Sequence, residues 1–199
     1  MTRKMGLLAA LILAGAATAQ ASVIGTPDAK QTPTDCALSA ADLEANAKLS
    51  FADFDQRGVT RATARKLGER YCYAQAARAR EHWLLWGPDL TERERNVASW
   101  HLFQDLASAG DEKAAAHILA TTRRSAAEEP DGFDWNTYVV GTWAFLVKDR
   151  ALLDQMTEKL GQGPGVRNAM NTKVLRRFQT CFDQPYGKAY DSEACAAGK

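Results

Sequence analysis

The chain has 199 residues and a nearly balanced charge, with 25 Lys and Arg against 24 Asp and Glu, for a formal net charge of +1. This balance argues against nucleic acid and against an anionic membrane surface as partners. The length fits one domain with a substantial core, and the abundance of Ala, Leu, Glu, Lys and Arg favours helix.

The N-terminus has the pattern of a secretory signal peptide over residues 1–21. Arg3 and Lys4 precede an apolar run over residues 5–17, and small residues then offer cleavage sites up to Ala21. The run is shorter than the ~20 residues that span a bilayer, so we expect no stable membrane anchor. Loss of Arg3 and Lys4 with the leader changes the formal charge from +1 to −1. The sequence therefore predicts a periplasmic or secreted protein.

The cysteines indicate a disulfide framework. Their even number in an exported chain favours two disulfides, and three pairings are possible in principle. We favour the two pairs that close a loop at each end of the chain, where termini otherwise fray. Their wide spacing argues against a zinc site, and we expect no metal and no cofactor. The favoured pairs are Cys36 with Cys72 and Cys181 with Cys195.

Capping and breaking signals divide the rest of the chain into helices. Residues 22–35 are rich in Pro, Thr and Asp and predict an extended lead-in to a single helical domain over residues 36–199. Ser39 with Asp42 and Thr91 with Glu94 have the spacing of capping boxes. A helix that begins near Cys72 should end at Trp86, before Gly87 and Pro88. The segment 53–58 is similar to a calcium loop, but Arg57 stands where an oxygen ligand is required.

The second half of the chain predicts further helical hairpins. A turn at Gly110 should join the helix after Thr91 to one over residues 112–122, and a loop is predicted over residues 128–132. The helix over residues 135–147 is apolar nearly all round and should be the buried centre, with residues 151–160 as its hairpin partner. The last helix should bury one stripe, formed by Val166, Met170, Val174, Phe178 and Cys181. No segment alternates over a useful length as a strand does.

The two central hairpins share a plan that resembles a tetratricopeptide repeat. Trp100 and Trp135 lie about 35 residues apart, near the period of that repeat. Leu67-Gly68-Glu69-Arg70-Tyr71 matches the Leu-Gly-x-x-Tyr part of its signature, although Ala64 stands where the signature has tryptophan.

The last half of the chain resembles a family of exported proteobacterial proteins of unknown role that are built from tetratricopeptide-like hairpins. The resemblance implies an all-α fold of stacked antiparallel hairpins, a short α-solenoid with a C-terminal capping helix. It carries over no catalytic residue. The segments that carry it are Trp135-Asn136-Thr137-Tyr138-Val139, residues 144–150 and residues 181–190.

Three histidines are the candidate bases for any catalysis. His82 and His117 project away from the apolar faces of their helices, so we expect them in solvent. His101 lies beside Trp100, where two hairpins should meet. We interpret it as a hydrogen-bonded interface histidine, and a ligand-binding or catalytic role is the alternative. No catalytic set is predicted.

The favoured function is a periplasmic module for protein–protein interaction without enzymatic activity, whose partner is another envelope protein. Candidate partner-binding residues are Trp86, Arg80, Arg93 and His101, because Trp and Arg are enriched in interface hot spots. The alternatives are an envelope enzyme or small-ligand-binding protein with a pocket near His101, and an inhibitor that uses residues 86–94. The question of enzymatic activity stays open.

Overall fold

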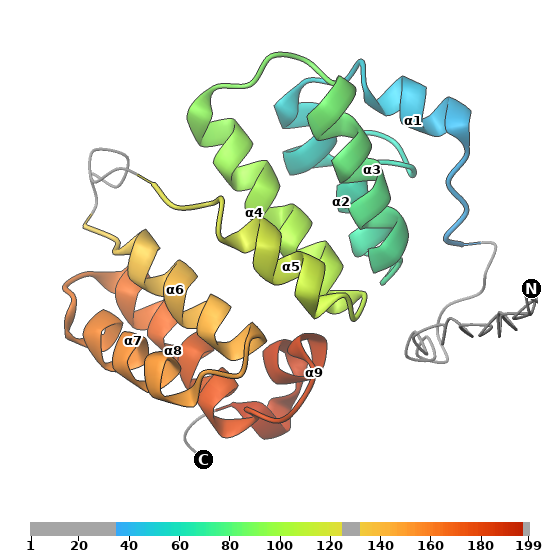
Figure 1. Ribbon diagram of the computed structural model, residues 1–199. Helices are drawn as coiled ribbons and strands as arrows, with labels where there is room; N and C mark the ends of the chain where they lie inside the picture. Colours follow the sequence, from blue (N-terminus) through green and yellow to red (C-terminus); the bar gives the residue numbers. More distant parts are fainter. Residues whose placement is uncertain (1–34, 125–131, 197–199) are drawn as a thin grey trace, which may run out of the picture.

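The computed structural model describes residues 35–124 and 132–196, which form helices joined by short connections, with no β-strand in these ranges (Figure 1). The signal peptide over residues 1–21, the lead-in up to residue 34 and the loop residues 128–131 lie outside the described residues. The elements are α1 Ala40–Asn46, η1 Ala52–Arg57, α2 Ala64–Gly68, α3 Tyr73–Trp86, α4 Glu92–Ser108, α5 Glu112–Leu119, α6 Trp135–Leu146, α7 Arg150–Gln162, α8 Val166–Thr180, α9 Tyr186–Asp191 and η3 Glu193–Cys195.

The helices stack as antiparallel hairpins, which confirms the predicted all-α architecture. Each helix from α2 to α9 packs against the next one along the chain, and α6 also packs against α8. In Figure 1, α6, α7 and α8 lie together, each packed against the other two, and α9 folds back to contact α4. The capping boxes at Ser39 and Thr91 form as predicted, so local sequence sets where α1 and α4 begin.

Three hairpins share one turn geometry. Tyr71, Gly110 and Lys148 each adopt a left-handed backbone, with φ of 64°, 91° and 59°. These residues lie 39 and 38 positions apart, so the structural repeat is longer than the spacing of Trp100 and Trp135 suggests. At each turn, the amide that follows the left-handed residue donates a hydrogen bond to the carbonyl five residues before it, as in a Schellman motif. The bonds run from Cys72 N to Leu67 O at 2.9 Å, Asp111 N to Leu106 O at 2.9 Å and Asp149 N to Ala144 O at 2.8 Å.

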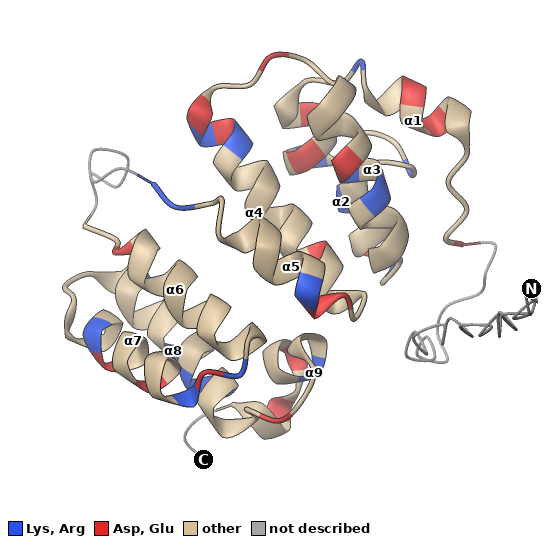
Figure 2. Cartoon of the chain, in the orientation of Figure 1, with Lys and Arg blue, Asp and Glu red and all other residues tan. Residues whose placement is uncertain are grey.

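Two apolar clusters form the core. Most residues of the first cluster come from the elements α4 through α9, and most residues of the second come from α1 through α3. The side chain of Leu84 packs against both clusters. The prediction that residues 135–147 form a central helix is confirmed for α6, which buries Val139 and Phe145 and carries no charged residue (Figure 2). A Cβ atom at Gly141 would lie 2.7 Å from Leu175 Cδ1, so glycine permits the close approach of α8.

The predicted stripe of α8 is wrong in its first half. Val166 and Met170 are 75% and 60% exposed, whereas Asn168 and Thr172 are buried in their place. The side chain of Asn168 is satisfied by backbone: it donates to Gly132 O and Pro164 O at 3.1 and 2.6 Å and accepts from Asp134 N at 3.0 Å. Hydrogen bonds to two loops therefore turn a polar face inward, which an apolar pattern does not reveal.

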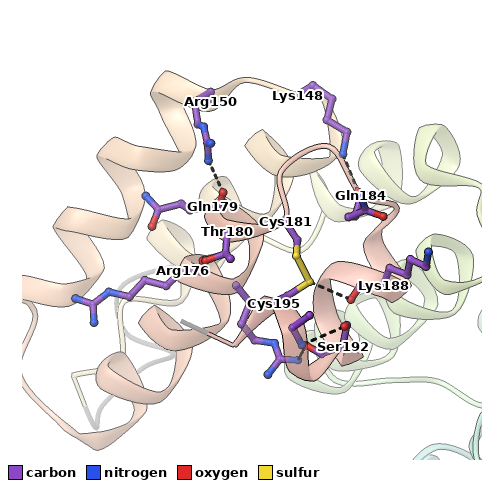
Figure 3. Close-up of a disulfide and its surroundings, with 12 residues drawn as sticks. Lys148, Arg150, Arg176, Gln179, Thr180, Cys181, Gln184, Lys188, Ser192 and Cys195 are labelled. Carbon is purple, nitrogen blue, oxygen red and sulfur yellow. Dashed lines mark hydrogen bonds between the residues drawn. A yellow bond between two sulfur atoms is a disulfide. The ribbon is translucent and has the colours of Figure 1, made fainter. Parts of the chain in front are cut away.

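Both predicted disulfides are present, with S–S distances of 2.08 Å for Cys36 and Cys72 and 2.02 Å for Cys181 and Cys195. The second one fastens η3 to the end of α8 (Figure 3). Cations from the α6–α7 turn meet carbonyls at the same helix end, where the helix dipole favours positive charge. Arg150 Nη1 donates to Gln179 O at 2.6 Å, and Lys148 Nζ donates to Phe182 O at 2.9 Å.

Candidate functional site

A buried network of charged side chains joins η1, α3 and α4. Arg80 on α3 donates from Nη1 to Asp55 Oδ1 on η1 and from Nε to Asp105 Oδ2 on α4, the latter at 2.9 Å. His101, one turn before Asp105, places Nδ1 2.8 Å from Asp55 Oδ2. An ionised carboxylate only accepts hydrogen bonds, so Nδ1 carries a proton and donates it to Asp55.

The two carboxyl groups of this network have opposite pKa shifts. Burial raises the pKa of Asp55, but the hydrogen bond from His101 and the charge of Arg80 outweigh it, and the pKa lies below its ordinary value. Burial also raises the pKa of Asp105, and there the opposing charge of Arg80 does not compensate. Asp105 is therefore the carboxyl group of the pair that protonates more readily.

A cleft of about 300 Å³ opens beside this network. Its volume is at the lower limit of typical small-ligand pockets. Helix α2 forms one wall with Arg65, Gly68 and the following Glu69, and α4 forms the other with His101, Gln104 and Asp105. The cleft thus combines His101 with three carboxylate residues, Asp55, Glu69 and Asp105, and it lies where the ligand-binding alternative expects a pocket.

A second feature is the exposed apolar end of α3. Leu85 and Trp86 are 74% and 70% exposed. The turn after them is tight: a Cβ atom at Gly87 would lie 2.4 Å from Trp83 O, so only glycine fits there. Trp83 anchors this helix end, because its ring stacks on Phe54 and its Nε1 donates to Leu49 O at 3.0 Å. The exposed pair is therefore presented from a fixed helix end.

The structure separates the residues that the sequence grouped as a partner-binding edge. Arg93 is exposed near the start of α4, as a surface role requires. Arg80 is only 3% exposed, so the interpretation of this residue as part of an exposed edge beside Trp86 is wrong. Its guanidinium is directed to Asp55 and Asp105 inside the fold. His101 belongs to the same network through its hydrogen bond with Asp55, and not to the exposed end of α3 that carries Trp86.

The histidines occupy three different environments. His101 is hydrogen-bonded between elements, which confirms its interpretation as an interface histidine. His117 is exposed as expected, whereas His82 is half-buried. Within residues 35–124 and 132–196, no group of three or more His, Cys, Asp or Glu side chains is arranged to hold a metal ion.

Sequence reasoning missed Asp55, Asp105 and Leu85. Asp55 and Arg80 are 25 residues apart, as are Arg80 and Asp105, so no local pattern connects them. Asp55 also lies on η1, a π-helical segment that capping and periodicity rules do not predict. Leu85 had a signal in the sequence: it precedes Trp86 and falls off the stripe formed by Ala76 and Trp83.

The fold places the protein among all-α stacks of antiparallel helical hairpins. Comparison of the chain with protein-family models, with curated proteins and with solved structures finds no match. No helix of the described part of the chain has both the length and the apolar composition of a membrane span. The two disulfides are compatible with an exported protein.

Proposed function

We propose that the protein is a periplasmic protein–protein interaction module whose contact surface, the α3 tip, consists of Leu85 and Trp86 with the exposed residues around them. The observation that supports this proposal is the pair of large apolar side chains at a rigid helix end. Tryptophan is prominent in interface hot spots, and a helix end whose backbone is already held in place loses little conformational entropy on binding.

The charges around the α3 tip favour a partner protein as the occupant. Glu81, Asp89, Glu92 and Arg93 are exposed, so residues of both signs lie close in sequence to the apolar pair. Figure 2 shows this mixture at the start of α4, where acidic and basic residues follow one another. A polyanion or an anionic membrane would select a surface of one sign, whereas a polar rim of mixed charge is typical of protein interfaces.

The proposal is tested by photo-crosslinking in the native host. A photoreactive amino acid replaces Trp86 in the full-length chain, and in a matched control it replaces Val166, which is 75% exposed on α8. We expect one dominant heavier band at position 86 that contains a second, different envelope protein. Bands of equal strength at both positions, or a second copy of this chain at position 86, would contradict the proposal.

Binding of the purified partner then measures the contribution of the tip. The double variant Leu85→Ala/Trp86→Ala should weaken affinity by at least about tenfold, which corresponds to ~1.4 kcal/mol. The control Val166→Ala/Met170→Ala removes an exposed apolar pair elsewhere and should leave affinity unchanged. Equal effects of the two double variants would show that the α3 tip has no special role.

A further inference from the structure

We infer that the cleft between α2 and α4 binds a small organic cation that carries an amine or guanidinium group. The cleft lies against the network of Asp55, Arg80, His101 and Asp105. It is separate from the α3 tip: Arg80 and Trp86 are six positions apart on α3, which corresponds to a rise of about 9 Å. The inference is therefore independent of the proposed function.

The inner wall of the cleft offers hydrogen-bond acceptors. Nδ1 of His101 is engaged by Asp55 Oδ2 at 2.8 Å, and in the tautomer with the proton on Nδ1 the other ring nitrogen, Nε2, is an acceptor. Asp105 engages Arg80 through Oδ2, whereas its Oδ1 faces Gly68: a Cβ atom built there would lie 3.8 Å from Oδ1. Gln104 adds an amide that can both accept and donate. A ligand that donates several hydrogen bonds fits this wall.

The charge of the inner wall also favours a cation. Asp55 and Asp105 share one guanidinium, that of Arg80, so the buried side chains of the network hold two carboxyl groups for one guanidinium. Arg65 and Glu69, which also line the cleft, form an exposed ion pair whose charges salt and water screen. The charges of the buried carboxyl groups are screened less than those of the exposed pair. A cation would therefore be drawn past the rim to Asp105.

Glycine at position 68 keeps the cleft open. Among the described residues, Asp105 Oδ1 is the only atom within 4 Å of its Cβ position, once the two chain neighbours and the backbone of its own helix are set aside. Gly68 lines the cleft, so a side chain added there would reduce the open volume beside Asp105. Gly68 is helical, so leucine is compatible with its conformation. The variant Gly68→Leu therefore blocks the cleft while it leaves the charged network intact.

The test is calorimetric titration of the mature protein with ligands of similar size and different charge. We expect putrescine or agmatine to bind, and 1,4-butanediol and succinate not to bind. Capped lysine, Nα-acetyl-lysine amide, distinguishes the source of the cation: binding of the free diamine alone indicates a metabolite, and binding of capped lysine alone indicates a side chain of a polypeptide. Absence of binding by every cation at millimolar concentration would overturn the inference, as would equal affinity for the diol.

Two variants locate the binding. Gly68→Leu should weaken binding of the cation by at least about tenfold. Gly161→Leu, at an exposed helical glycine of α7, is the matched control and should bind as the native protein does. Thermal unfolding of both variants establishes that each is folded. Unchanged affinity in folded Gly68→Leu would place the cation outside this cleft and overturn the inference.

Discussion

Asp55 is the residue on which the buried network depends most. It is fully buried, and it accepts hydrogen bonds from both Arg80 and His101. In the variant Asp55→Asn, the buried guanidinium keeps only one carboxylate partner. Breaking one side of a buried ion pair costs about 3 to 5 kcal/mol, and we expect a loss of this order in the free energy of unfolding by urea.

The control for this loss is Asp53→Asn on the same segment. Asp53 pairs with the exposed side chain of Arg57, and exposed pairs contribute less than about 1 kcal/mol. Equal losses in the two variants would show that burial of the network has no energetic consequence.

Asp105 makes the free energy of unfolding depend on pH. Its pKa in the folded protein lies above the ordinary value of 3.8, so the unfolded chain releases this proton first as pH rises. The contribution of Asp105 to stability is therefore present below that value and is lost as pH rises through the folded pKa. Asp105→Asn lacks this titration.

Urea denaturation across the pH range checks this dependence. As pH rises above the ordinary aspartate pKa of 3.8, the unfolding free energy of Asp105→Asn should change less than that of the native protein, because the variant lacks the raised pKa. The contribution of Asp55 to stability has the opposite sign and is lost as pH falls below 3.8, because its folded pKa is lowered. Parallel profiles of the native protein and the variant would contradict the assignment.

The tryptophans provide a matched pair of substitutions, one buried and one exposed. Trp135 packs with its ring centroid 4.7 Å from that of Trp100, and its Nε1 donates to Thr122 O at 2.7 Å. Trp135→Ala should lower the free energy of unfolding by about 3 to 5 kcal/mol. Trp86→Ala should change it by less than about 0.5 kcal/mol, because that ring is mostly exposed. An equal change in both would contradict the central position of α6.

The residues that sequence analysis placed correctly are those whose role is decided by their neighbours along the chain. Trp135 follows its own capping residue, Asp134, and lies in an apolar helix, so its burial was predictable. The partnership of Arg80 with Asp55 and Asp105 was not, because it depends on how η1, α3 and α4 are packed together. The candidate cleft needs the same packing, and only its His101 was anticipated.

At the scale of the elements, the repeated turn determines how hairpins close. Gly110 has φ of 91°, and a Cβ atom there would meet nothing within 4 Å, so its cost would be purely conformational. Gly110→Ala should destabilise the protein by about 1 kcal/mol in thermal or urea unfolding. Gly161→Ala, within helix α7, should instead stabilise it by up to about 1 kcal/mol. The same sign for both would contradict the turn geometry.

Helix ends were easier to predict than helix faces. The capping boxes at Ser39 and Thr91 are local and formed as expected. The inward face of α8 was mispredicted because Asn168 is stabilised by carbonyls of Gly132 and Pro164, which the fold brings to it. The spacing of the three hairpin turns could not be recognised in the sequence either, because three different residue types, tyrosine, glycine and lysine, occupy the equivalent left-handed positions.

At the scale of the whole molecule, the disulfides restrain the two ends of the hairpin stack. Cys36 and Cys72 close a loop of 36 residues and join the segment before α1 to the start of α3. Cys181 and Cys195 close a loop of 14 residues at the opposite end. A disulfide stabilises mainly by limiting the unfolded chain, and the effect grows with loop length.

The two ends should therefore differ in how much their disulfides stabilise. Loop entropy predicts a loss of about 4 kcal/mol for Cys36→Ala/Cys72→Ala and about 3 kcal/mol for Cys181→Ala/Cys195→Ala. Urea unfolding of the two double variants measures the difference, and non-reducing peptide mapping of the native protein establishes the pairs. If the C-terminal variant lost more stability, the cause would lie in the folded state, because the closing segment also carries Tyr186, whose ring packs on Phe103 of α4. The order of the two losses thus distinguishes restraint of the unfolded chain from docking of the C-terminal helices.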